Sequence, residues 1–320
     1  MRILALVPGG IGDQILFFPT LADLAQSYPQ AAIDVIVEPR SKGAYRVCPH
    51  VSDVLTFDYK DRNGLADYLN LLGIIRDREY DIALALGQRW TVGLLLWLNG
   101  IPVRVGYQTN SSWFLSCPVP LKTEQYAAHM YHDLLQGLGI QTSCPPLQIN
   151  VPRADIDWAE AEQQRMDLTD TGYILIHGGS SQMALSKGID KIYPPSQWQK
   201  VIESIQEKQP SLPIVLLQGP EDEDWVKQMR AANSSLKATN PPDIGKLAAL
   251  IAGANLMLCT DSAPMHLAVA VGTYTVALFG PTDAKKLLPP DSDNAVSIQS
   301  PTDSIADIPP EAILEEVWRV

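Results

Sequence analysis

The sequence lacks an excess of basic residues, and this excludes one large class of function. It has 24 Lys and Arg against 36 Asp and Glu, a formal net charge of −12 at pH 7. Because nucleic-acid binding needs a basic footprint for the phosphates, we expect no nucleic-acid partner. Residues 1–150 hold 11 basic and 13 acidic side chains, net −2, whereas residues 151–320 hold 13 and 23, net −10. Only the first half is therefore suited to an anionic surface or substrate.

The sequence also has few cysteines and no long apolar run. The four cysteines form no Cys-x-x-Cys pair and have no zinc-site spacing, so we expect free thiols in a reducing compartment. The apolar run at residues 3–7 is too short for a signal peptide, and the longest later run, at 94–98, is far too short to span a membrane. We therefore expect a soluble, cytoplasmic protein.

Apolar segments that alternate with helical patterns predict an α/β fold in two parts. A length of 320 residues suits two domains, and a proline-bearing passage at 144–152 separates two similar patterns. We predict domains at 1–150 and 151–320, each a doubly wound parallel sheet, with a last helix at 310–319 packing across their junction. The expected strands are 3–7, 33–37, 54–57, 82–86, 173–177, 214–218, 236–239, 256–260 and 274–279, with helices between them, including 65–78 and 126–138.

A glycine loop, Gly9-Gly10-Ile11-Gly12-Asp13, directly follows the first expected strand. Such loops let backbone approach a dinucleotide, and Glu38 ends the second strand where a ribose contact would lie. However, the third glycine of that motif is missing, since its place falls on Ile15, and Asp13 would repel a pyrophosphate. Two interpretations stay open from these residues alone: a nicotinamide-dependent oxidoreductase, or a helix that begins with Asp13 as a first-turn residue.

The segment from Asp261 to Thr282 predicts an anion-binding corner. Asp261 and Ser262 are typical helix caps, Pro264 suits the first helical turn, and Gly272 ends the apolar run. A helix beginning at this point presents free backbone N–H groups at its positive end, which favours a phosphate.

Three further features follow strands of the second half. Gly179-Ser180-Ser181 predicts a phosphate cradle or merely a tight loop, and Lys191 closes that loop or is an ordinary surface lysine. Glu221 is placed to hold a ribose or to cap a helix. His266, one turn inside the helix after Asp261, is by itself typical of a core histidine.

We expect no metal site. His129 and His132 are three residues apart with Asp133 beside them, but no further ligand completes a set.

Taken together, these motifs resemble glycosyltransferase family 9, the heptosyltransferase family of lipopolysaccharide assembly, over nearly the whole chain. The resemblance implies the GT-B architecture, two Rossmann-like domains facing across a cleft, with the acceptor bound by residues 1–150 and the nucleotide-sugar by residues 151–320. The motifs on which the resemblance rests are Gly12-Asp13, Gly179-Ser180-Ser181, Lys191-Ile192-Tyr193-Pro194-Pro195, Gly219-Pro220-Glu221-Asp222-Glu223, Asp261-Ser262-Ala263-Pro264-Met265-His266 and Leu278-Phe279-Gly280-Pro281-Thr282.

The resemblance also implies roles for single residues. Asp13 would be the catalytic base, with Gly10 and Gly12 in the loop near the acceptor. The donor would be bound by Ser180, Ser181, Lys191, Glu221, Asp261, Ser262, Ala263 and His266. The resemblance implies no metal ion and no cofactor.

The function expected is that of an inverting, metal-independent glycosyltransferase. It would move a heptose-like sugar or a hexose from a nucleotide-diphospho-sugar, with ADP a candidate carrier, to a hydroxyl of a glycan or lipid-linked acceptor in envelope polysaccharide or lipopolysaccharide synthesis. We expect a monomer that can make weak peripheral contact with the inner face of the plasma membrane. The alternative is a non-catalytic nucleotide-sugar-binding module of a glycan assembly complex.

Overall fold

A computed structural model divides the chain into two units, residues 1–150 and 151–320. No helix in the described part of the chain is long and apolar enough to cross a lipid bilayer. The residues described are 1–59, 63–110, 112–168, 172–179, 188–290 and 292–319.

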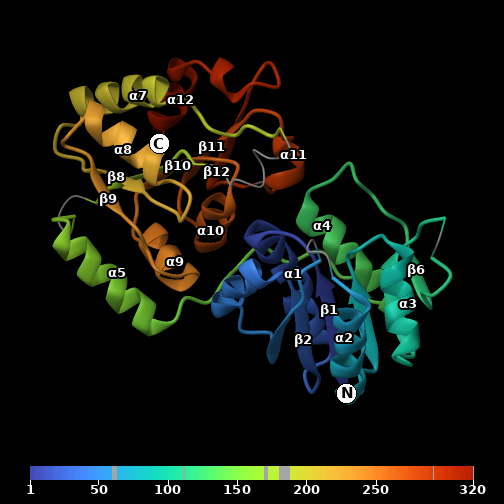
Figure 1. The fold of residues 1–320 in the computed structure, drawn as a ribbon. Helices are drawn as coiled ribbons and strands as arrows, with labels where there is room; N and C mark the ends of the chain where they lie inside the picture. Colours follow the sequence, from blue (N-terminus) through green and yellow to red (C-terminus); the bar gives the residue numbers. More distant parts are fainter. Residues whose placement is uncertain (60–62, 111, 169–171, 180–187, 291, 320) are drawn as a thin grey trace. The chain divides into compact units, whose positions relative to one another are not determined.

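The first unit is built on a parallel sheet of six strands in the order β3-β2-β1-β4-β5-β6 (Figure 1). The chain begins at the centre of this sheet, runs outward through β2 and β3, and returns to continue on the other side of β1. Ligands of such sheets bind outside the carboxyl ends of the strands where the order reverses, here at β1. The strands are β1 (Arg2–Val7), β2 (Ala32–Val37), β3 (Asp53–Thr56), β4 (Ile82–Ala85), β5 (Val103–Tyr107) and β6 (Cys117–Val119).

Helices cover both faces of this sheet. Side chains from α2 and α3 share a buried cluster with Leu4, Leu6 and Ile36 of the central strands, whereas α1 packs against α4 and the 3₁₀ helix η1. Residues 3–7 of β1 and all of β4 are buried, and their sequences are accordingly apolar throughout. The elements are α1 (Ile11–Ser27), η1 (Pro39–Val47), α2 (Leu65–Asp77), α3 (Trp90–Leu98), α4 (Ala127–His132) and the 3₁₀ helix η2 (Asp133–Leu138).

The second unit repeats this topology, with the parallel strand order β12-β11-β10-β7-β8-β9. Its first strand, β7, again lies at the centre, and the order reverses between β7 and β10. The strands are β7 (Ile174–His177), β8 (Ile214–Leu217), β9 (Lys237–Thr239), β10 (Leu256–Thr260), β11 (Thr275–Phe279) and β12 (Ala295–Gln299).

The last helix, α12, packs within the second unit. Its Ile313 and Val317 share a buried cluster with Trp198 of α7 and Leu278 of β11. The packing across the domain junction that we expected of this helix stays a prediction. The helices of the unit are α5 (Arg153–Arg165), α7 (Pro195–Lys208), α8 (Glu223–Ala232), α9 (Ile244–Ala252), α10 (Ala263–Val271), α11 (Ala284–Leu287), the 3₁₀ helix η3 (Ile305–Asp307) and α12 (Pro310–Val317).

The predicted α/β class with doubly wound parallel sheets is confirmed, but several elements were missed. The strands β5, β6 and β12 and the helices α3 and α5 did not appear in the sequence analysis. β6 is three residues long with Pro118 at its centre, and β12 is only partly buried at the sheet edge. The expected helix at 126–138 was wrong in detail, because α4 ends at His132 and a 3₁₀ helix follows.

Candidate functional site

The loop after β1 is folded around the carboxylate of Asp13. Asp13 lies in the first turn of α1, and its Oδ2 accepts a hydrogen bond from the Gly10 N–H at 2.7 Å. Gly9 has a φ of +118°, and a Cβ at this position would lie 2.3 Å from Asp13 Oδ2. Only glycine therefore fits here, because any side chain at this position would collide with the Asp13 carboxylate. Gly12 lies in the same first turn.

A second donor holds the other oxygen of this carboxylate. The Tyr131 hydroxyl, on α4, donates to Asp13 Oδ1 at 3.1 Å, and the Tyr131 ring packs edge-on against Phe17 of α1. Burial, together with the negative charge of Asp13, raises the pKa of Tyr131 well above its ordinary value, so the hydroxyl stays a donor. Sequence reasoning missed Tyr131, because nothing local connects it to a residue 118 positions away.

The end of β2 supplies polar groups beside the same loop. The Ser41 hydroxyl donates to the Gly9 carbonyl at 2.7 Å, which fixes the loop. Arg40 Nε donates to Glu38 Oε2 at 2.9 Å, and a terminal nitrogen of Arg40 lies 3.9 Å from where a Gly10 Cβ would be. Glu38 thus forms an ion pair with Arg40, and the ribose role weighed for it stays a prediction.

In the second unit, a hydrogen-bonded chain joins three strand-end loops. His177, the last residue of β7, contacts Asp222 Oδ2 through Nε2 at 3.1 Å and Ser262 Oγ through Nδ1 at 3.1 Å. The Gly219 N–H also donates to Asp222 Oδ2, at 2.7 Å. This network ties the ends of β7, β8 and β10 together at the edge where Rossmann-like sheets bind ligands.

The buried carboxylate of the β8–α8 loop is Asp222, whereas the predicted donor residue Glu221 is exposed. Burial raises the pKa of Asp222, but hydrogen bonds from His177 and Gly219 and the charge of His177 outweigh it and leave this pKa below its ordinary value. Sequence reasoning named the neighbour because adjacent carboxylates after a strand cannot be ranked for burial by pattern.

Lys191 and Asp261, both predicted to bind the donor, contact each other. The Lys191 ammonium donates to Asp261 Oδ2, and the Asp261 side chain is only 5% exposed. Next to it, the Thr260 hydroxyl donates to the Gly179 carbonyl at 3.1 Å, which anchors the start of the predicted phosphate loop. Ser180 and Ser181 of that loop lie outside the described residues.

The N-terminus of α10 follows Asp261 directly, as predicted. Ser262 is the N-cap residue in extended conformation, its side chain caps no helix N–H, and Ala263 and Pro264 open the first turn. The Ser262 hydroxyl instead contacts His177 and donates to the Thr260 carbonyl at 3.1 Å. His266 is 4% exposed within the helix. The partial positive charge of this helix end is thus available to an anion.

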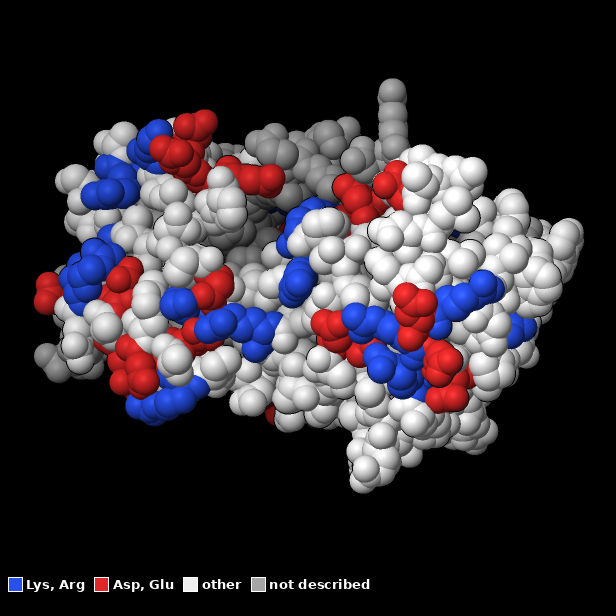
Figure 2. All heavy atoms as spheres, turned by 60° about the horizontal axis from the view of Figure 1, so that its bottom comes forward, with Lys and Arg blue, Asp and Glu red and all other residues white. Residues whose placement is uncertain are grey.

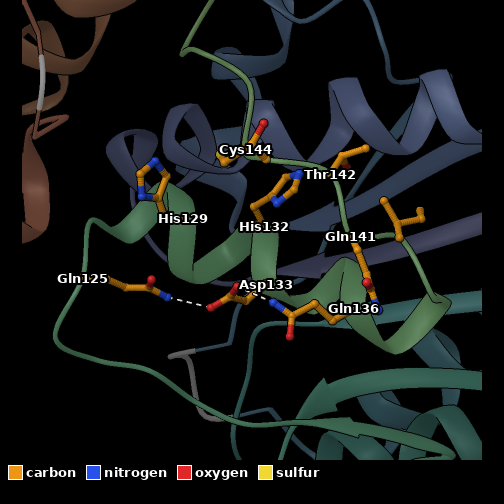
Figure 3. A pocket seen from close by; sticks show the side chains of 10 residues that line it. Gln125, His129, His132, Asp133, Gln136, Gln141, Thr142 and Cys144 are labelled. Atoms are coloured by element: carbon orange, nitrogen blue, oxygen red, sulfur yellow. Dashed lines mark hydrogen bonds between the residues drawn. The ribbon is translucent and has the colours of Figure 1, made fainter.

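A separate hollow of about 540 Å³ opens beside α4 and η2 (Figure 3). Gln125 and Gln136 point toward Asp133 and donate to it at 2.7 and 2.6 Å, and Lys122 lies 3.1 Å from the same carboxylate. The Asp133 carboxylate is thus satisfied by protein partners, which is typical of a structural network.

The histidines of this hollow are engaged in protein contacts. His132 Nε2 pairs with buried Asp23 at 2.8 Å, and the His129 ring packs edge-on against Tyr126. Burial raises the pKa of Cys144 to about 12, so it is a thiol rather than a thiolate ligand. Within the described ranges, no three His, Cys, Asp or Glu side chains form a group that could hold a metal ion.

The profile of glycosyltransferase family 9 (heptosyltransferase) matches residues 69–315. Lipopolysaccharide heptosyltransferase 3 of Escherichia coli is 25% identical over 294 residues, which cover 85% of this chain and 81% of that protein. The photosynthetic NDH subunit of subcomplex B 1, a chloroplast protein of Arabidopsis thaliana, is also 25% identical, over 96% of this chain and 71% of its own length.

The solved structure of the E. coli ADP-heptose lps heptosyltransferase II has the same fold. It superposes with a TM-score of 0.81 and covers 100% of this chain and 98% of that one, at 21% sequence identity. Each of the two units described above therefore corresponds to one Rossmann-like domain of the GT-B architecture.

Proposed function

This chain belongs to glycosyltransferase family 9 and is a glycosyltransferase, and on that premise we propose that it transfers a sugar from a nucleoside-diphosphate carrier to a hydroxyl of a glycan or lipid-linked saccharide. The observation that carries the proposal is the Asp13 carboxylate, which receives one hydrogen bond on each oxygen, from Gly10 and Tyr131. A side chain held at the carboxyl end of a central strand in this way is suited to act on a bound substrate.

In the proposed reaction Asp13 is the general base. An ionised carboxylate has about four acceptor sites, and Gly10 and Tyr131 use two of them, which leaves lone pairs for the proton of the acceptor hydroxyl. The acceptor oxygen attacks the anomeric carbon as the bond to the diphosphate breaks, and the proton passes to Asp13. A single displacement of this kind inverts the anomeric configuration.

The second unit is proposed to hold the donor. Its diphosphate would lie at the N-terminus of α10, where the backbone of Ser262 and Ala263 faces the ligand, with Lys191 providing the charge. Glu221 would hold the ribose, and Ser180, Ser181 and His266 would complete the donor site. Fixed dipoles and one lysine can stabilise the leaving diphosphate, so the proposed reaction needs no metal.

The names of the relatives suggest the donor and the class of acceptor. The structural relative is described as an ADP-heptose transferase and the E. coli relative as a lipopolysaccharide heptosyltransferase. We therefore propose an ADP-linked heptose or hexose as donor, an acceptor in envelope polysaccharide or lipopolysaccharide synthesis, and action by a monomer at the cytoplasmic face of the membrane.

The proposal is tested by donor binding followed by product analysis. ADP, UDP, GDP and CMP sugars are screened by thermal shift, and we expect one nucleotide class, ADP, to raise the melting temperature, because a ligand of the native state stabilises it. With the identified donor and a panel of glycan acceptors, NMR should show a product of inverted anomeric configuration, formed equally well with EDTA. Retention of configuration, or loss of activity with EDTA, would overturn the mechanism.

The second candidate function is a non-catalytic nucleotide-sugar-binding module in a larger complex. The observation that favours it is the chloroplast relative, which is described as a subunit of a complex and aligns with 96% of this chain. Nucleotide-sugar binding without transfer or hydrolysis of the sugar, across the same acceptor panel, would support this alternative.

A further inference from the structure

The large exposed hydrophobic side chains of this protein are concentrated in one part of the first unit. Among the described residues nine such side chains are exposed; one is Met1, and all the others lie between positions 65 and 113. The described part of the second unit has none. Scattered exposed apolar residues are normal, but a concentration of them marks an interaction site. The eight are Leu65, Tyr68, Leu69, Ile74, Trp90, Trp97, Leu98 and Trp113.

The helix α3 is the centre of this concentration. Its sequence, WTVGLLLWL, has no charged residue, yet only Gly93 and Leu96 are buried. A helix that is apolar all round is normally enclosed by protein or lipid. Trp90 and Trp97, at its two ends, are each 51% exposed, which leaves the helix partly uncovered in this chain.

The loop after β5 extends the same surface. Phe114 packs between the two indoles of α3, with ring centroids 6.4 Å from Trp90 and 5.7 Å from Trp97. Trp113, next to it, is 84% exposed, the largest exposed fraction among these side chains. We call Trp90, Trp97, Leu98, Trp113 and Phe114 the aromatic surface.

The segment that carries the aromatic surface has basic residues but no acidic ones. Residues 82–123 contain no Asp or Glu, although the chain has 36 of them. Basic groups lie at both ends of α3: Arg89 is its exposed N-cap residue, and an Arg76 terminal nitrogen donates to the Leu98 carbonyl at 2.9 Å. Arg104 donates to the Phe114 carbonyl at 2.6 Å. Figure 2 shows wide areas without charged side chains on the unit at the right.

We propose that the aromatic surface docks the protein on a lipid bilayer that contains anionic phospholipids. Indole rings are preferred at the boundary between headgroups and acyl chains, and arginines beside them contact phosphates. The absence of carboxylates from residues 82–123 removes the repulsion that an anionic surface would exert, whereas the net charge of −10 on residues 151–320 disfavours docking through the second unit.

This inference rests on the proposed function, because it names the surface that would hold the protein at the membrane. Vesicle binding is nevertheless measured without donor or acceptor. The two proposals can therefore fail separately: a chain that binds vesicles without transferring sugar contradicts only the reaction, and the reverse result contradicts only the docking surface.

The test is flotation of the full-length chain with vesicles of phosphatidylcholine, with or without about one third phosphatidylglycerol. Wild-type protein should float with the anionic vesicles, and its tryptophan fluorescence should shift to the blue. The triple variant Trp90→Ala, Trp97→Ala, Trp113→Ala should bind these vesicles about tenfold or more weakly, because three indoles no longer leave water. Trp113→Ala alone, at a largely exposed position, should already weaken binding severalfold without affecting folding.

The matched control is Trp158→Ala, which removes a partly buried indole from α5 of the second unit. It should bind vesicles like wild type, and circular dichroism should confirm that every variant is folded. Equal vesicle binding by wild type and the triple variant, or no binding by wild type, would overturn the proposal. Sedimentation without lipid gives a further test. A dimer formed by wild type but not by the triple variant would also overturn the proposal, because the aromatic surface would then be an interface between two copies.

Discussion

The two units have the same strand order and opposite chemistry at corresponding places. In each, the first strand lies at the centre of six and the chain reverses beside it. The loop after β1 encloses a carboxylate, Asp13, whereas the loops after β7, β8 and β10 bring together His177, a lysine and a helix N-terminus. The sheet therefore decides where a site can be, and the loop residues decide what it can do.

The units also differ in what they present to their surroundings. Residues 1–150 have a net charge of −2 and carry the exposed aromatic surface, whereas residues 151–320 have a net charge of −10. The same strand order thus occurs with different surface properties in the two units. Each variant below changes one unit only. Loss of the proposed base (Asp13), of the buried loop carboxylate (Asp222) and of the hydroxyl that positions the base (Tyr131) can therefore be distinguished.

The largest expected effect comes from Asp13→Asn. Removal of a general base should lower kcat by roughly 10²–10⁴-fold, while the affinity for the nucleotide, assigned to the second unit, stays unchanged. Steady-state kinetics of transfer and nucleotide titration measure the two quantities. Asp67→Asn is the matched control, because Asp67 accepts from the Gly64 N–H in the first turn of α2 as Asp13 does from Gly10 in α1. Near-normal turnover of Asp13→Asn would remove this residue from the mechanism.

The next effect concerns the second unit, through Asp222→Ala. This change leaves His177 and the Gly219 N–H without their buried partner, so the free energy of unfolding should fall by about 2 kcal/mol in urea titrations. Glu221→Ala, one residue away and exposed, should change stability by less than about 0.5 kcal/mol but should weaken nucleotide binding if it holds the ribose. The reverse ranking of the two variants would contradict the structure of this loop.

The contribution of Asp222 should also depend on pH in a defined direction. Its pKa in the folded protein lies below the ordinary value of about 3.9. Its stabilising effect is therefore complete above that ordinary value and is lost as the pH falls toward the lower, folded-state pKa. The difference in stability between wild type and Asp222→Ala should therefore shrink as the pH falls below about 4.

The smallest of these effects is expected from Tyr131→Phe. The ring packing against Phe17 is kept, but Asp13 loses one of its two donors. The loss of a hydrogen bond that positions the base should lower kcat about tenfold. KM for the donor should stay the same. An unchanged kcat with reduced stability would show that Tyr131 is only a packing residue.

The parts of the fold that could be predicted are those with strong local signals. β1, β7, β10 and β11 are largely apolar, buried runs followed by loops with glycine or helix-capping residues, and the positions of Asp13 and Ser262 follow from them. Edge strands such as β6 and β12 lack that signal because they are short or partly exposed.

Contacts between distant residues could not be predicted. Tyr131 meets Asp13 across 118 positions, and His177 meets Ser262 across 85, and neither separation leaves a trace in the local pattern. The same holds for burial within a loop, since Asp222 and Glu221 are chemically alike and only the tertiary structure distinguishes them. The exposure of Trp97 on an apolar helix also depends on what covers the helix, which composition does not show.

The pairing of Lys191 with Asp261 has a consequence for product release. In the proposed reaction, the departing nucleoside diphosphate gains negative charge and would bind a free lysine more tightly than the donor did. In that reaction Asp261 would compete for the same ammonium group and so limit how tightly the spent carrier is held. A lysine shared in this way between a fixed carboxylate and a transient phosphate would favour repeated turnover over retention of the product.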